Sequence, residues 1–157
     1  MSKKLEQYKK MNQQLEALIG DVPHLVANMA NASALLYQTL EDINWAGFYL
    51  MQQGKLVLGP FQGKTACIEI EVGKGVCGTA VKRDKVMLVR NVHEFQGHIA
   101  CDSASNSEIV IPIHKDREIF GVLDIDSPSL ARFDEEDYIG LCEFVQIFEK
   151  FLRKSTI

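Results

Sequence analysis

The amino-acid sequence predicts an α+β fold, in which helices pack on a mostly antiparallel sheet. Patterns of amphipathic helices occupy residues 5–40 and 134–153, near the two ends of the chain. Between them, residues 43–126 contain short apolar runs and a hairpin signal at Gln53-Gly54. The order of two helices, a hairpin, further strands and a last helix is typical of this fold class.

The first two helices are predicted at residues 5–19 and 23–40, with a break at Gly20-Asp21-Val22-Pro23. In the second helix, apolar side chains recur at helical spacing and would form one face. These residues are Leu25, Met29, Ala32, Leu35, Leu36 and Leu40. An apolar face of this kind needs a partner surface, and we expect the sheet to supply it.

Six runs of apolar or alternating residues predict the strands. They cover residues 43–50, 55–58, 67–72, 86–89, 108–114 and 119–126. Residues 115–118 form a polar turn between the last two runs. Between the third and fourth runs, Gly73–Gly78 predicts a tight turn that enters a short helix at Thr79–Arg83.

The last helix is predicted to begin after Asp134, whose carboxylate can cap it, with Asp137 in its first turn. Its apolar stripe comprises Tyr138, Leu141, Cys142, Val145, Phe148 and Leu152. Cys142 is therefore assigned to the core.

Composition and charge exclude several classes of protein. The 157 residues fit one domain, predicted to span residues 1–157, and 46% hydrophobic with 24% charged residues is ordinary for a globular protein. A net charge of -4 without a basic run argues against nucleic acid. No signal peptide or membrane span is visible, so we expect a cytoplasmic protein with no membrane partner. Cysteines in the cytosol are more often catalytic, metal-binding or buried than joined in structural disulfides.

Three cysteines, Cys67, Cys77 and Cys101, are the strongest functional signal. Cys101 lies in the polar run 97–108, which is long for a loop and rich in small residues. Such a loop would give a nucleophilic thiol access to substrate, whereas the alternative is an incidental small residue. Asp102 and Glu108 would disfavour a thiolate by charge repulsion. We therefore expect a substrate that needs an acid beside the thiol, such as a sulfoxide or a peroxide.

Cys67 and Cys77 have two open interpretations. They could be resolving thiols that form a disulfide with a reactive cysteine, or they could ligate a metal. Zinc ligands usually come in closely spaced pairs, and no such pair occurs here, so no metal is expected.

Carboxylates and aromatic residues form two further sets of candidates. Asp124 and Asp126 share one face of a strand, either at a solvated strand end or, with Glu108, in a pocket. In a pocket, burial and repulsion would raise one pKa and leave a neutral acid that can donate a proton. Trp45 and Tyr49 also share a face, and would either pack in the core or form an aromatic wall against a small apolar group.

Several long motifs resemble the free methionine-(R)-sulfoxide reductase family of GAF-domain proteins. They are Trp45–Tyr49, Gly59–Cys67, Gly73–Ala80, Gly97–Glu108 and Gly121–Ser127. The resemblance implies a GAF domain with a six-stranded, mainly antiparallel sheet flanked by helices, in a homodimer. The boundaries expected for its parts are helices at 5–40, sheet and active-site loops at 43–126 and a last helix at 134–153.

The same resemblance implies roles for the candidate residues. Cys101 would be the catalytic thiol, Cys67 its disulfide partner and Cys77 an accessory resolving thiol. Trp45 and Tyr49 would contact the methyl-sulfoxide end of free methionine (R)-sulfoxide. The carboxylates of Glu108, Asp124 and Asp126 would bind its ammonium group and hold or protonate its oxygen.

By resemblance, thioredoxin would be the reductant, and neither a metal nor an organic cofactor is expected. The alternative function is a non-catalytic GAF module that senses a small molecule.

Overall fold

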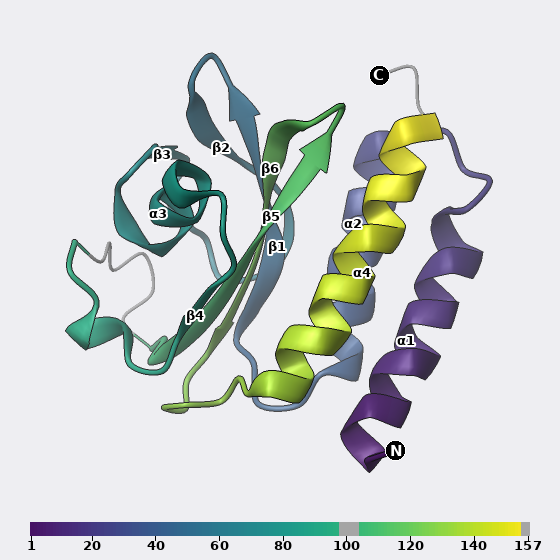
Figure 1. Ribbon diagram of the computed structural model, residues 1–157, viewed down its shortest axis with the longest axis horizontal. Coiled ribbons are helices and arrows are strands. Elements are labelled where there is room, and N and C mark those ends of the chain that lie inside the picture. The colour runs from purple at the N-terminus through teal and green to yellow at the C-terminus, as the bar shows by residue number, and fades with distance from the viewer. Residues whose placement is uncertain (98–103, 155–157) are drawn as a thin grey trace.

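The computed structural model describes residues 1–97 and 104–154, and in this part of the chain six antiparallel strands form one sheet (Figure 1). The strands are β1 (Trp45–Gln52), β2 (Lys55–Gly63), β3 (Glu69–Glu71), β4 (Met87–Val89), β5 (Ser107–Lys115) and β6 (Glu118–Ser127). Their order across the sheet is β3-β2-β1-β6-β5-β4. The α+β prediction is therefore confirmed. The central pair joins β1 to β6, which lie far apart in the sequence.

Two-residue turns close the hairpins β1–β2 and β5–β6. Gln53 and Gly54 have φ of 52° and 80°, and Asp116 and Arg117 have φ of 53° and 70°. Two consecutive positive φ angles are characteristic of the turns that match the right-handed twist of paired strands. Both turns lie where the sequence predicts them.

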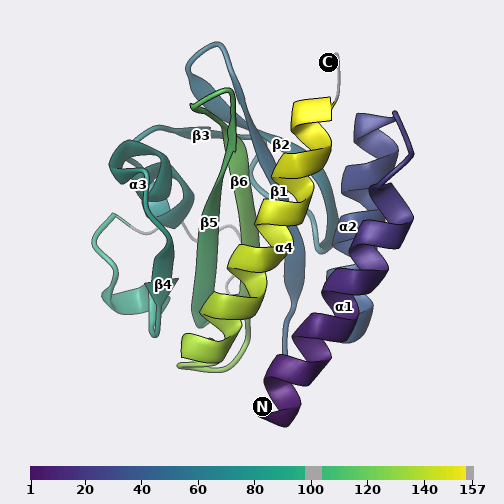
Figure 2. The ribbon, with the colours of Figure 1, turned by 45° about the vertical axis from the view of Figure 1, so that its right-hand side comes forward.

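Helices cover both faces of the sheet (Figures 1 and 2). On one face lie α1 (Lys3–Ile19), α2 (Leu25–Thr39) and α4 (Glu135–Lys154), and on the other lies α3 (Gly75–Arg83). No helix in the described ranges is both long and apolar enough to cross a membrane. In the part of the chain that the structure describes, α2 and α4 therefore pack on one face of the sheet with α1 packed on both of them, and the short helix α3 packs on the other face.

The larger hydrophobic core lies between the sheet and the helices α1, α2 and α4. Phe48 of β1 meets Phe148 of α4 there, with ring centroids 5.1 Å apart. Two residues of the predicted α4 stripe depart from this core. Tyr138 is 38% exposed, and Cys142 packs against the core but is only half-buried. Both residues lie at the margin of the apolar stripe, so helical periodicity assigns them to the stripe although they are only partly buried.

Charged and polar groups fasten the beginning of α4 to α1. As predicted, Asp134 caps α4, because its carboxylate accepts hydrogen bonds from the backbone N–H of Glu136 and of Asp137. Asp137 is buried, accepts a 2.6 Å hydrogen bond from the Tyr8 hydroxyl and pairs with Lys4 at 2.9 Å. This buried carboxylate is thus paired and hydrogen-bonded, as a buried charge must be.

The helix α3 begins at Gly75, four residues before the predicted start at Thr79. Gly78 causes the difference: a Cβ atom there would lie 2.3 Å from the carbonyl oxygen of Glu71. This glycine therefore serves close packing of the helix on the end of β3 and not a turn. As a result, Cys77 lies inside a helix on its buried face.

Candidate active site

The face of the sheet beneath α3 carries a row of functional side chains across its three central strands. Trp45 of β1 lies opposite Asp126 of β6, and Asp126 lies opposite Glu108 of β5. Directly opposed residues project to the same face of a sheet, so register alone brings the indole and the two carboxyl groups together. Asp124, two residues before Asp126, joins them on that face.

A cavity of about 50 Å³ opens over this row. Roughly 10–15 Å³ suffices for one water molecule, so the cavity suits a small ligand. Residues predicted from the sequence that line it are Trp45, Tyr49, Cys77, Glu108, Asp124 and Asp126. The other lining residues are Thr65, Ala66, Ile70, Lys74, Gly75, Val76 and Ser105. The pocket interpretation of the carboxylates therefore applies, and the solvated strand end does not.

Glu108 is the carboxyl group whose pKa this arrangement raises. Its side chain is 7% exposed, and burial raises its pKa well above the usual value. The charges of Asp124 and Asp126, and hydrogen bonds with both, raise it further. A raised pKa favours the neutral carboxyl, the form that can donate a proton to a ligand.

Cys77 projects from α3 into the same cluster. Its sulfur approaches Oε2 of Glu108 at 4.0 Å, and its side chain is free of any disulfide. Burial raises the pKa of the Cys77 thiol well above its usual value, and the charge of Asp124 raises it further. Since the thiolate is the nucleophile, a thiol held protonated is poorly suited to form a disulfide with a reactive cysteine.

Cys77, Glu108 and Asp124 also offer ligand atoms that all lie within 4.8 Å of one another. An ion bound there would have to displace the protons that burial holds on the thiol and on Glu108. The donor set therefore fits a proton-holding cluster better than a metal centre.

Trp45 and Tyr49 form an aromatic wall of the cavity. Their rings stack with centroids 5.9 Å apart, and both side chains are at most 3% exposed. Phe61 of β2, which the sequence analysis missed, also stacks on Trp45, with ring centroids 5.0 Å apart. No local pattern singles out Phe61 in the sequence. Its ring has room on this face because the residue opposite it in β1, Gly47, has no side chain. Both interpretations of Trp45 and Tyr49 hold, because the rings are packed and still line the cavity.

The segment 64–68 connects β2 to β3 beside this wall and carries Cys67. Trp45 Nε1 donates a 3.1 Å hydrogen bond to the carbonyl of Lys64, and the Tyr49 hydroxyl donates a 2.9 Å bond to the carbonyl of Cys67. Cys67 is half-buried and disulfide-bonded. Cys101, the predicted catalytic thiol, lies outside the described residues.

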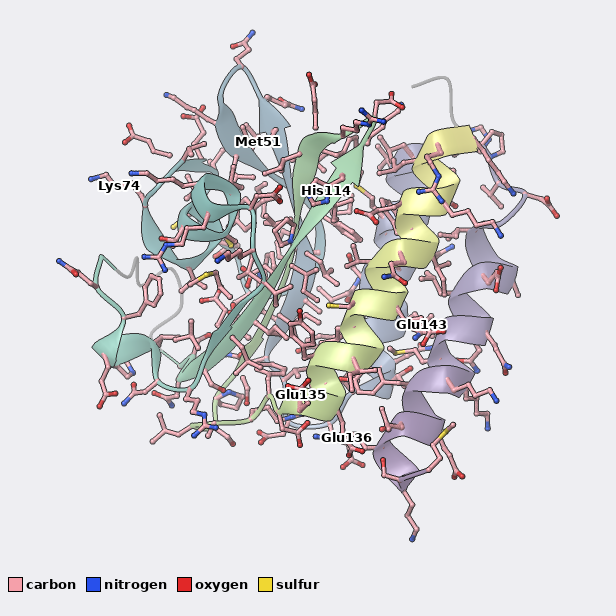
Figure 3. The ribbon with its side chains drawn as sticks, in the orientation of Figure 1. Met51, Lys74, His114, Glu135, Glu136 and Glu143 are labelled. Atoms are coloured by element: carbon pink, nitrogen blue, oxygen red, sulfur yellow. The ribbon has the colours of Figure 1, made fainter. Side chains whose placement is uncertain are left out.

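Lys74 is a charged lining residue that the sequence analysis missed. It is the exposed N-cap residue of α3 and lies on the α3 side of the sheet (Figure 3). The labelled acidic residues Glu135, Glu136 and Glu143 lie on α4, on the other side of the sheet. A lysine between two glycines at a helix start was the only sequence signal of Lys74. It places a cation at the edge of a cavity whose other charged groups, among the described residues, are carboxyls.

Comparisons with known proteins agree with this geometry. Residues 15–152 match the GAF domain family. The chain is 55% identical over 149 residues to the free methionine-R-sulfoxide reductase of Escherichia coli, covering 95% of this chain and 90% of that protein.

Solved structures of relatives superpose closely on the chain. One, from Neisseria meningitidis, is a free methionine-R-sulfoxide reductase in complex with its substrate; it has a TM-score of 0.94 and 42% identity, over 99% of this chain and 93% of that one. The reduced form of fRMsr from Staphylococcus aureus has a TM-score of 0.90 and 53% identity, over 92% of this chain and 94% of that one. Both the predicted fold and the predicted family are confirmed, and the chain belongs to the free methionine-R-sulfoxide reductase family of GAF-domain proteins.

Proposed function

We propose that this chain reduces free methionine (R)-sulfoxide to methionine with electrons from its own cysteine thiols. The observation that carries the proposal is the buried carboxyl of Glu108, whose pKa is raised, in a small cavity beside an aromatic wall. A sulfoxide oxygen must be protonated before its sulfur accepts electrons, and a proton donor inside the cavity meets that need. The names of the similar proteins support the same substrate.

In the first step, the thiol of Cys101 attacks the substrate sulfur while Glu108 donates its proton to the oxygen. The oxygen then passes to the Cys101 sulfur, and methionine leaves. The sulfoxide gains two electrons, and Cys101 is oxidised to a sulfenic acid. The proton of the thiol restores Glu108.

In the second step, the Cys67 sulfur bonds to that of Cys101, the S–O bond of the sulfenic acid breaks, and water leaves with the proton of Cys67. The participation of Cys67 in a disulfide supports its assignment as the resolving thiol. The buried, protonated state of Cys77 argues against it as a second resolving thiol and supports a role in the carboxyl cluster.

Charged groups of both signs explain why the substrate would be a free amino acid. Asp124 and Asp126 would pair with the ammonium group, and Lys74 with the carboxylate. A methionine sulfoxide inside a protein chain offers neutral amides in place of both charges.

The reductant, assembly and location belong to the same proposal. A dithiol protein such as thioredoxin would reduce the disulfide through a mixed disulfide. A cytosolic location suits this cycle, because thiols are kept reduced there. The family resemblance supports a homodimer.

Separate assays with the R and S diastereomers of free methionine sulfoxide test the function. With dithiothreitol as reductant, we expect consumption of the R form alone, and Cys101→Ser should abolish it. If fully reduced protein consumes neither form, the alternative of a ligand-sensing GAF module becomes the better explanation.

A further inference from the structure

We propose that Tyr49 is a positioning residue for Cys67, which it holds where its sulfur can close the disulfide. This role goes beyond contact with the substrate and rests on the proposed function for its place in the catalytic cycle. Its physical basis is the 2.9 Å hydrogen bond that the Tyr49 hydroxyl donates to the backbone carbonyl of Cys67.

Tyr49 is well suited to hold another residue in place. It lies in β1, which is paired on both sides, and its side chain is 2% exposed. Burial raises the pKa of its hydroxyl, with the charge of Asp124 next in importance, so the group remains a hydrogen-bond donor at physiological pH.

The segment that carries Cys67 depends on such bonds. Ile68, the next residue, is 71% exposed, and Lys64 and Thr65 are exposed as well, whereas Ala66 and Cys67 are half-buried against the smaller core. Packing of this connection is therefore partial, and hydrogen bonds must contribute to its order. Hydrogen bonds tie three of its backbone carbonyls to the sheet: Lys64 accepts from Trp45, Cys67 from Tyr49 and Ile68 from the backbone N–H of Leu58. The bond from Tyr49 is the one that meets Cys67 itself.

Holding the backbone of Cys67 favours the disulfide because it removes freedom from the reduced state before the bond forms. The reaction is the one given above: an S–S bond forms, the S–O bond of the sulfenic acid breaks, and water leaves. Loss of one hydrogen bond of ordinary strength would lower the equilibrium constant for oxidation of Cys67 by about three- to tenfold.

The test compares Tyr49→Phe with a matched control, Tyr8→Phe. Each change removes one hydroxyl from a buried tyrosine, and the Tyr8 hydroxyl bonds to Asp137 on the opposite face of the sheet. Each protein is equilibrated in buffers of reduced and oxidised dithiothreitol. Free Cys67 is then alkylated and quantified by mass spectrometry of its peptide.

We expect the equilibrium constant for oxidation of Cys67 to fall about three- to tenfold in Tyr49→Phe and to be unchanged in Tyr8→Phe. A tenfold fall corresponds to about 30 mV in reduction potential. An unchanged constant in Tyr49→Phe, or an equal fall in both variants, would overturn the proposal. The titration contains no sulfoxide, so its result stands even if the assays with methionine sulfoxide disprove the proposed function.

Discussion

At neutral pH a surface glutamate is charged, whereas Glu108 is buried beside Asp124 and Asp126, whose charges oppose its ionisation. Its neighbours across the sheet are fixed by strand register, so the proton donor cannot leave the carboxyl cluster without unpairing β5 from β6. The reactivity proposed for this residue therefore comes from its surroundings and not from its type.

Replacing Glu108 with glutamine tests its role as proton donor. Since an amide cannot donate a catalytic proton, we expect the Glu108→Gln rate of methionine formation to fall about 100-fold or more. Exposed Glu118, at the start of β6, provides the control Glu118→Gln, which should retain the normal rate. A Glu108→Gln enzyme with near-normal turnover would assign the proton to another group.

The raised pKa of Glu108 also links stability to pH. Because the folded protein binds this proton more tightly than the unfolded chain, the stability from Glu108 is fully present below the ordinary pKa of glutamate. It is lost as pH rises through the raised value. Urea unfolding midpoints across pH should therefore decline less steeply in Glu108→Gln than in the parent. Parallel curves would contradict the assigned direction of the shift.

Lys74 can be tested through the carboxylate of the substrate. We expect Lys74→Met to raise KM for free methionine (R)-sulfoxide about tenfold, with a smaller effect on kcat, since a charge-assisted contact is lost. Methionine sulfoxide amide, which lacks the carboxylate, should be turned over equally by both proteins. Lys82→Met on the same helix is the control. Equal losses on both substrates would exclude the carboxylate contact.

At the scale of the element, α3 is where local propensity and packing conflict. The sequence Gly75-Val76-Cys77-Gly78 reads as a turn because glycine is unfavourable in helices. The helix forms nevertheless, since the absence of a Cβ at Gly78 allows it to approach the carbonyl of Glu71. That approach sets the depth of Cys77 in the cluster.

Gly78→Ala measures the importance of this approach. Although alanine favours helices, its methyl group would meet Glu71 at 2.3 Å, so we expect a loss of about 1–3 kcal/mol in unfolding free energy. Lys82→Ala, in the same helix but exposed, should be neutral or slightly stabilising. Chemical denaturation checks both. A stabilised Gly78→Ala protein would show that the helix can shift at no cost.

At the scale of the whole molecule, period and turn chemistry were sufficient to predict the hairpins, the cap at Asp134 and the positions of the strands, although β2 continues to Gly63, beyond its predicted end at residue 58. The local pattern around Glu108, Asp124 and Asp126 could place side chains on a face but could not decide between pocket and solvent. That choice depends on the pairing of β1 with β6 and on where α3 lies, both of which are long-range facts. Phe61 and Lys74 were missed for the same reason, because their neighbours are distant in sequence.

The two faces of β1 serve the stable core and the candidate site at once. Phe48 packs on Phe148 of α4, while Trp45 and Tyr49, on the opposite face, wall the cavity. A mutation in this strand that changes the substrate would therefore lower the stability of the fold as well as alter the chemistry. Thr65 and Lys74 are exposed residues that border the cavity, so substitutions there can change specificity, whether natural or engineered, at less cost to the fold.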